Sequence, residues 1–294
     1  MPSSDLSQNL FKGLTIAKAR RSLASRLSEA GFEVPQIEAR RLLEIASGLS
    51  HAELIAKSDT VLDTKMETNL EVLLRRRLSG EPLDYIQGYK AFYGRDFIIN
   101  GDVLSPRPET EDLVRLALEH IKPIEAPRVL DLGTGSGAII ISIVLESKKA
   151  VGLGVDISEA ALKVASQNRR KFGVSGAVSL HKSHWLENVS GAFDVIVANP
   201  PYISGADMLD LAVEVKDYDP HIALSGGPDG LDAYKEIIRT IGPHLSPKGR
   251  LILEIGHDQA ILVQKLMGQA GLVGIEIFKD LSGHDRIVSG LAGP

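Results

Sequence analysis

The chain has 294 residues, a net charge of −5, 44% hydrophobic residues and no cysteine. This length allows two domains with hydrophobic cores, and the composition is that of a globular protein. The absence of cysteine excludes disulfides, thiolate metal sites and cysteine nucleophiles. The negative charge gives no overall field that attracts nucleic acid, and no uncharged apolar run has the length of a membrane span. We therefore expect a cytoplasmic protein with no membrane contact.

Residues 1–80 are predicted to form a small helical domain. Capping residues and stop glycines delimit four expected helices: 15–30, 37–47, a short one opened by the capping box Ser50–Glu53, and about 65–79. This stretch carries no evident chemistry. By analogy with helical domains attached to other enzymes, we expect it to recognise a macromolecular substrate.

Residues 81–104 are predicted to form a β-hairpin linker. Short β-type runs at Tyr85-Ile86, Ala91–Tyr93 and Phe97–Ile99 are separated by glycines. A stiff segment follows, in which Arg107 stands between two prolines and precedes Glu109 and Thr110. Arg107 is either a fixed arm over a site or the surface charge of a linker, and the pattern does not separate these readings.

Residues 105–294 alternate between strand and helix patterns, which predicts an α/β, Rossmann-like, doubly wound sheet with right-handed crossovers. The tail is predicted to be an antiparallel hairpin that closes the sheet. The expected strands are 129–132, 151–155, 178–181, 193–198 and 250–255, followed by 274–278 and 286–288 in the hairpin. The expected helices are 138–145, 159–172, 233–245 and 258–270, with one more before the first strand that runs to about 120.

A glycine turn follows the first of these strands, with the sequence Gly133-Thr134-Gly135-Ser136-Gly137. Asp156 lies at the end of the next strand, where a carboxylate can accept both hydroxyls of a ribose. The spacing differs from the G-x-G-x-x-G of dinucleotide sites, and the preceding Asp131 would repel a pyrophosphate but suits a cationic amino-acid group. The combination favours S-adenosylmethionine over NAD, although a purely structural strand–helix turn is the alternative.

The strand 193–198 ends at Asn199-Pro200-Pro201-Tyr202. Neither proline can extend a sheet ladder, so Asn199 is expected at the carboxyl edge, where open parallel sheets bind ligands. The Asn199 side-chain oxygen and the Pro200 carbonyl can accept both hydrogens of a planar –NH2 group, while Tyr202 covers its face. The alternative is an ordinary turn that ends a core strand.

Trp185, the single tryptophan, follows the third strand at the same edge, after His184. Its indole can lie against an adenine, or it can be a core or rim residue without contact to a ligand.

The order of these motifs resembles that of the HemK/PrmC family of protein-(glutamine-N5) methyltransferases, which modify peptide chain release factors. The matching stretches are Pro106–Glu111, Asp131–Ile139, Asn199–Tyr202, Ala223–Leu231, Leu253–Gly256 and Asp280–Arg286, with Ile37–Leu43 in the helical part. The resemblance implies a class I methyltransferase that transfers a methyl group from S-adenosylmethionine to the glutamine of the Gly-Gly-Gln loop of class 1 release factors. S-adenosylhomocysteine is the product, and no metal or direct nucleic-acid contact is implied.

The resemblance also implies roles for individual residues. The substrate amide is held at Asn199, Pro200, Pro201 and Tyr202. The cofactor is bound by Gly133, Thr134, Gly135, Ser136, Gly137, Asp156 and Trp185, with Asn199 beside it. Further candidates for the site are Arg107, Glu109, Thr110, Asp131, His184 and Glu254. His184 departs from the family, in which an aspartate commonly precedes the tryptophan as a partner for the adenine amine. A neutral imidazole accepts one hydrogen bond but an imidazolium accepts none, so cofactor affinity is expected to fall below about pH 6.5.

Four other functions compete with this hypothesis. The closest are a ribosomal-protein glutamine methyltransferase and a DNA or RNA base-amine methyltransferase, because Asn-Pro-Pro-Tyr also serves a flipped base. The negative charge and the lack of an evident basic duplex-binding module argue against the base-amine enzyme. An NAD(P)-dependent oxidoreductase does not fit the glycine spacing. A scaffold without activity gives no reason for Asn199 and Asp156 to occur together.

Overall fold

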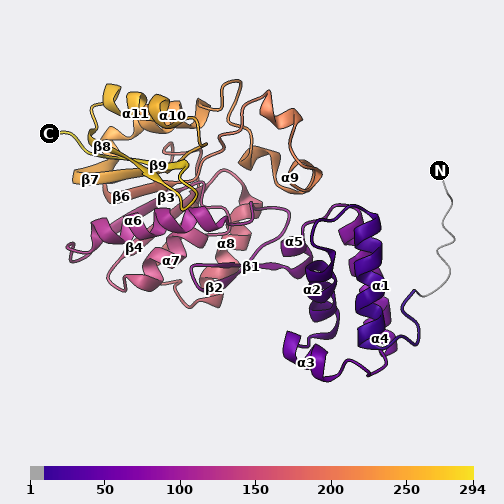
Figure 1. Ribbon diagram of the computed structural model, residues 1–294. Helices are drawn as coiled ribbons and strands as arrows, with labels where there is room; N and C mark the ends of the chain where they lie inside the picture. The colour runs from indigo at the N-terminus through magenta and orange to yellow at the C-terminus, as the bar shows by residue number, and fades with distance from the viewer. Residues whose placement is uncertain (1–9) are drawn as a thin grey trace. The chain divides into compact units, whose positions relative to one another are not determined.

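The computed structural model describes residues 10–294 and divides into two compact units, residues up to Gln87 and from Gly88 to Pro294 (Figure 1). The first unit is helical, as predicted. Its helices are α1 Ile16–Glu29, α2 Pro35–Ser47, α3 His51–Ala56, α4 Thr64–Leu78 and α5 Leu83–Gln87.

The predicted helix caps of the first unit are confirmed. Thr15 accepts a hydrogen bond from the Lys18 amide at the start of α1, and Ser50 and Glu53 form both halves of a capping box at α3. Gly48 ends α2 in the left-handed conformation with φ of 70°. The buried faces of these helices share one apolar core that includes Leu23, Leu42, Leu70 and Leu74.

The β-type prediction for Tyr85-Ile86 is wrong, because both residues lie in α5. The Pro82 carbonyl accepts hydrogen bonds from the amides of Tyr85 and Ile86, both at 3.0 Å, which starts the helix. Both side chains are buried at 6% exposure. A short apolar pair cannot distinguish a buried strand from a buried helix turn.

The predicted hairpin exists and belongs to the second unit. β1 (Tyr89–Phe92) and β2 (Arg95–Ile98) are antiparallel and joined by Tyr93-Gly94, both with positive φ as tight hairpin turns require. The Asn168 side chain hydrogen-bonds both the amide and the carbonyl of Ile98, at 2.7 and 2.9 Å. The hairpin is therefore fixed to α8 (Glu159–Lys171).

The second unit contains a seven-stranded sheet in the order β5-β4-β3-β6-β7-β9-β8. Its strands are β3 Arg128–Leu132, β4 Val151–Asp156, β5 Val178–Lys182, β6 Phe193–Ala198, β7 Leu245–Glu254, β8 Val273–Lys279 and β9 Asp285–Leu291. The first five are parallel, and β9 pairs antiparallel with both β7 and β8. The predicted doubly wound sheet with a closing hairpin is thereby confirmed.

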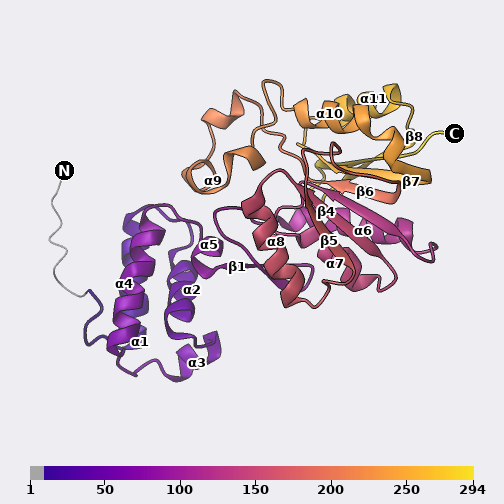
Figure 2. The same cartoon turned by 180° about the vertical axis from the view of Figure 1, so that it is seen from behind.

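Helices cover both faces of this sheet (Figures 1 and 2). One face packs on α6 and α7 and the other on α10 and α11, each over its own apolar core. The helical segments are η1 Pro108–Thr110, α6 Glu111–Ile121, α7 Ala138–Glu146, α8 Glu159–Lys171, η2 Asp207–Leu209, α9 Val213–Tyr218, η3 His221–Ala223, α10 Asp232–Thr240, η4 Gly242–His244 and α11 Ala260–Gln269. Between residues 10 and 294, none of the helices combines the length and apolar character needed to cross a bilayer.

Candidate active site

The chain leaves β3 to build β4 and β5 on one side and then returns to build β6 on the other side of β3. Such a switch point between two crossovers leaves a crevice at the carboxyl ends of the strands. A cavity of about 450 Å³ lies there, lined by residues that follow β3, β4, β5 and β6. Leu132 and Ala198 are partners in the β3–β6 ladder, so Gly133 and Asn199 leave the sheet side by side.

Eleven of the residues singled out in the sequence line this cavity: Arg107, Thr110, Gly133, Thr134, Gly135, Ser136, Asp156, His184, Trp185, Asn199 and Pro201. Six others do not contribute to its lining: Glu109, Asp131, Gly137, Pro200, Tyr202 and Glu254. The lining also includes residues that sequence reasoning did not select, in 102–105, 220–227 and 232–236.

The first two glycines of the turn adopt left-handed backbone conformations. Gly133 and Gly135 have φ of 69° and 54°, where other residues are strained. A Cβ on Gly133 would stand 3.5 Å from the indole of Trp185, so the turn is bare next to that ring. Gly137 has a packing role instead, because a Cβ there would stand 2.9 Å from Ile141 Cδ1.

Asp131 supports the turn from beneath. It is fully buried, and its Oδ2 accepts a hydrogen bond of 2.6 Å from the Thr134 hydroxyl. Burial raises the pKa of Asp131 to about 7, against the opposing effect of the Thr134 bond. Its Oδ1 has no hydrogen-bond partner among residues 10–294. A cationic group near this turn would favour the ionised carboxylate.

Asp156 is fixed by two backbone amides. Oδ2 accepts from the Gly135 amide and Oδ1 from the Ser158 amide, both at 2.9 Å. Burial raises its pKa, and these hydrogen bonds oppose the rise. Each oxygen keeps a lone pair for another donor, so the carboxylate can accept two hydroxyls from a ligand in the cavity.

Trp185 is held in a strained backbone conformation with φ of 45°. The Ser183 hydroxyl donates to the Trp185 carbonyl at 2.9 Å and accepts from the Asn188 amide at 3.0 Å. This arrangement places the indole in the cavity wall. The Trp185 side chain also packs against the apolar core between the sheet and helices α10 and α11. No pattern in the sequence indicated the positive φ.

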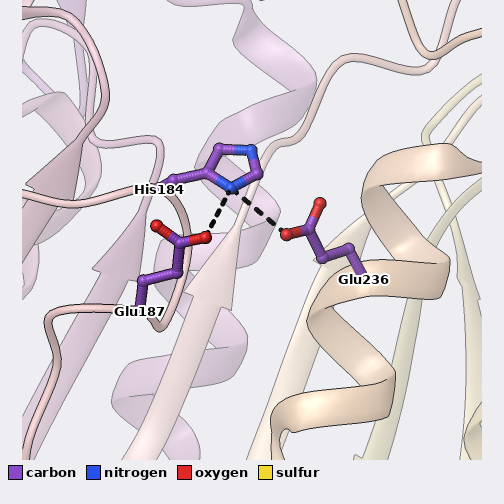
Figure 3. Close-up of side chains that lie close together, drawn as sticks. All are labelled: His184, Glu187 and Glu236. Carbon is purple, nitrogen blue, oxygen red and sulfur yellow. Dashed lines mark ion pairs between the residues drawn. The ribbon is translucent and has the colours of Figure 1, made fainter.

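His184 lies between two carboxylates (Figure 3). Its Nδ1 is 3.2 Å from Glu236 Oε1 and 3.5 Å from Glu187 Oε1. Because carboxylates only accept, they favour the tautomer with hydrogen on Nδ1, which leaves Nε2 as an acceptor. The possible ligand atoms of His184, Glu187 and Glu236 lie within 4.8 Å of one another. Such a group could hold a metal ion, but all three side chains are substantially exposed. The hydrogen bonds alone account for the arrangement.

Asn199 stands at the edge of β6 in contact with two other polar side chains. Its Nδ2 lies 3.3 Å from the Thr110 hydroxyl oxygen, and both side chains lie near the carboxylate of Glu254 and lower its pKa. Asn199 and Thr110 line the cavity. The donor end of the Asn199 amide is thus occupied, and its oxygen is the end available to a ligand.

Arg107 reaches the long connection between β6 and α10. Its Nη2 lies 3.2 Å from Oδ2 of Asp219, whose side chain is 2% exposed. Arg107 and Pro220 both line the cavity. This ion pair therefore joins two walls of the cavity, which gives the extended Pro-Arg-Pro segment a structural role.

A glycine-rich loop supports the residues after Asn199. Gly226, Gly227 and Gly230 pack so closely that a Cβ on Gly226 would stand 2.8 Å from the Pro201 carbonyl oxygen. Gln259 bridges the two segments, because its Nε2 donates to the carbonyls of Tyr202 and Gly230 at 3.0 and 3.1 Å. Its Oε1 accepts from the Gly256 amide at 3.0 Å. Sequence reasoning missed Gln259, since only the folded chain brings its partners together.

Replacing Gln259 with leucine is expected to lower the free energy of unfolding by about 1–3 kcal/mol, because buried carbonyls lose their donor. The measurement is chemical denaturation of both proteins. Gln269→Leu, at an exposed position at the end of the same helix, is the matched control and should change stability little. Equal unfolding midpoints for the Gln259 variant and the parent protein would refute the bridging role.

Comparisons with known proteins agree with this geometry. The PrmC N-terminal domain family matches residues 18–88, and the Methyltransferase small domain family matches residues 110–215. A methyltransferase structure from Pyrococcus furiosus superposes with a TM-score of 0.51 at 20% identity, covering 70% of this chain and 92% of that one. The sheet and the matched domain together define a methyltransferase with the class I S-adenosylmethionine-dependent fold.

Two bacterial relatives narrow this class. The release factor glutamine methyltransferase of Cereibacter sphaeroides is 41% identical over 93% of this chain and 97% of its own length. That of Caulobacter vibrioides is 39% identical over 96% of this chain and 98% of its own. The chain belongs to the release factor glutamine methyltransferase family, as the sequence motifs predicted.

Proposed function

We propose that this protein transfers the methyl group of S-adenosylmethionine to the side-chain amide nitrogen of the glutamine in the Gly-Gly-Gln motif of class 1 peptide chain release factors. The observation that carries the proposal is the position of Asn199 beside Gly133 on one cavity, in a chain of this family. An amide acceptor and a bare glycine turn are the two components that such a transfer requires.

The residues of the cavity fit the cofactor. When bound, S-adenosylmethionine supplies an electrophilic methyl group carried by a sulfonium. Gly133 and Gly135 allow close approach to the backbone, and Asp156 has lone pairs for both ribose hydroxyls. Trp185 offers its face to the adenine, and the buried Asp131 places a carboxyl group beneath the turn for the cationic amino-acid end.

The substrate amide is held by acceptors on the other side of the cavity. Asn199 Oδ1, on the cavity wall, is proposed to take one hydrogen. The carbonyl of the next residue, Pro200, is proposed to take the other with Tyr202 beside it, although neither of these two residues contributes to the cavity lining. A planar amide is a weak nucleophile because its lone pair is delocalised. Acceptors aimed at its hydrogens stabilise the nitrogen as charge develops on it in the transition state.

No general base is needed. Alignment of the amide nitrogen with the methyl carbon can account for about 7–11 kcal/mol of the barrier. The proton leaves after transfer, when the alkylated amide is strongly acidic. The helical unit, which matches the PrmC N-terminal domain, is proposed to contribute to recognition of the release factor.

The test is incubation of the protein with labelled S-adenosylmethionine and, separately, a release factor, ribosomal proteins and DNA. We expect label in the release factor alone, and none in a release factor whose Gly-Gly-Gln glutamine is replaced by alanine. Label in ribosomal protein or DNA with an unlabelled release factor would overturn the proposal in favour of those substrates.

His184 is proposed to accept a hydrogen bond from the adenine amine through Nε2. Removal of this acceptor should then weaken cofactor binding by about 1 kcal/mol, or roughly fivefold in the dissociation constant. Calorimetric titration of the cofactor measures the change.

The His184→Ala variant should bind the cofactor more weakly than the parent protein at pH 8. His181→Ala, an exposed histidine on the neighbouring strand that does not line the cavity, is the control. An unchanged dissociation constant in His184→Ala would remove His184 from the adenine site.

A further inference from the structure

We propose that Glu254 is a positioning residue that fixes the orientation of the Asn199 amide, so that its oxygen and not its NH2 group faces the substrate. This inference rests on the proposed function, because Glu254 acts on the substrate only through Asn199. It adds a third residue to the amide site and explains how that site selects an –NH2 group.

The geometry joins three segments of the chain. Glu254 is the last residue of β7, and Leu253 pairs with Ala198, so Glu254 lies next to Asn199 at the sheet edge. Thr110 approaches from the end of η1. The Glu254 carboxylate lies near the side chains of Thr110 and Asn199, which lower its pKa, and Asn199 Nδ2 is 3.3 Å from the Thr110 hydroxyl oxygen. The described residues that line the cavity include Thr110 and Asn199 but not Glu254.

Donor and acceptor counting sets the direction of each bond. An ionised carboxylate has no hydrogen to give, so Thr110 donates its single hydroxyl hydrogen to Glu254. The Thr110 oxygen can then accept from Asn199. Because both neighbours of the Asn199 amide accept, its NH2 group turns toward them and Oδ1 is left for the cavity. If the Asn199 amide were flipped, its oxygen would face the Glu254 carboxylate and its NH2 group would face the NH2 group of the substrate. Both contacts are unfavourable.

Burial of the Glu254 carboxylate destabilises the fold, which argues for a role beyond packing. Glu254 is 4% exposed, and its Oε2 has no hydrogen-bond partner among residues 10–294. Burial raises its pKa to about 7, although Thr110, Arg286 and Asn199 oppose the rise. An uncharged side chain of similar volume would avoid the cost of desolvating a carboxylate. The ionised acid is the form that orders the Asn199 amide.

Protonation of Glu254 should therefore weaken the site. A protonated carboxyl has a hydrogen to donate, and the rotated amide can accept it. Four other titratable groups face this carboxyl: Arg286 on β9, Glu109 in η1, Tyr202 after β6 and Tyr234 on α10. Burial raises the pKa of both tyrosines, and, against desolvation, the bond to Asp280 raises the pKa of Arg286, so these three groups keep one charge state between pH 6 and 8. Turnover is expected to rise with pH through about 7 as Glu254 ionises.

The experiment compares Glu254→Gln with the parent protein in steady-state methylation of a release factor between pH 6 and 8.5. We expect kcat at pH 8 to fall about 10–100-fold, the range seen when a group that orients a functional side chain is removed. KM for the release factor and the dissociation constant of the cofactor should stay within about twofold. The rise of kcat near pH 7 should be absent. Glu276→Gln, an exposed glutamate on β8, should resemble the parent.

A second measurement does not depend on activity. The side-chain NH2 resonances of Asn199 in ¹⁵N-labelled protein, assigned by their loss in Asn199→Ser, should shift with a midpoint near pH 7 in the parent and not in Glu254→Gln. Static resonances in the parent, or a Gln variant with unchanged kcat and pH profile, would overturn the inference. If Glu254→Gln does not fold, the pH dependence of the Asn199 resonances in the parent protein tests the inference by itself. A parent protein that leaves the release factor unmethylated contradicts the proposed function, whereas the resonances still test Glu254.

Discussion

Replacing Asn199 with alanine is expected to lower kcat for release factor methylation by roughly 10²–10³-fold, the cost of removing one preorganised hydrogen-bonding group from a transition state. The Asn199 oxygen is the end of this cavity-lining amide that is left for the substrate, because the nitrogen lies 3.3 Å from the Thr110 hydroxyl oxygen. Without it, the Pro200 carbonyl alone remains to hold the substrate amide. The measurement is single-turnover methylation with saturating cofactor, which isolates the transfer step from product release.

A measurement of cofactor binding distinguishes the loss of turnover in Asn199→Ala from a general loss of structure. Asp156 and the glycine turn are held by bonds that do not involve Asn199, so the dissociation constant of the cofactor should stay within about twofold. Asn188→Ala, at an exposed position before β6, is the control for the substitution itself. Near-normal turnover in Asn199→Ala would contradict the amide-clamp mechanism, whatever the effect on binding.

Features that depend on local chemistry were predicted from the sequence. The prolines after Asn199 stop β6 where expected, and Gly133 and Gly135 leave the turn without a Cβ, so that a ligand can approach its backbone. Alternation of strand and helix patterns then placed Gly133, Asp156 and Asn199 at one edge of the sheet. These residues meet at the cavity because parallel strands present their carboxyl ends together.

Features that depend on distant contacts were not predictable in this way. Gln259 bridges two loops that meet only after folding, and the tautomer of His184 depends on Glu236, which comes from a different element. The segment between β6 and α10 had no regular pattern, yet Pro220 to Gly227 contribute to the cavity wall. The wrong strand prediction for Tyr85-Ile86 has a related cause, because burial and not the local pattern decided between helix and strand.

Replacing Asp156 with alanine is expected to weaken cofactor binding by about 100-fold or more. Two ribose hydroxyls lose a charged acceptor, and hydrogen bonds to charged groups contribute about 1.5–3 kcal/mol each. The Gly135 and Ser158 amides also lose their shared partner, so the glycine turn is less firmly held. Calorimetric titration of the cofactor measures the change, with Asp258→Ala, an exposed aspartate before α11, as the control.

The kinetic effect of Asp156→Ala should differ in kind from that of Asn199→Ala. Because Asp156 contacts no group on the substrate side of the cavity, a saturating concentration of cofactor should restore much of kcat in Asp156→Ala. Excess cofactor should restore nothing in Asn199→Ala, where the lost contact acts on the substrate amide. If Asp156→Ala bound the cofactor normally, the carboxylate would be serving only the Gly135 and Ser158 amides, and the ribose would have to be held elsewhere in the cavity.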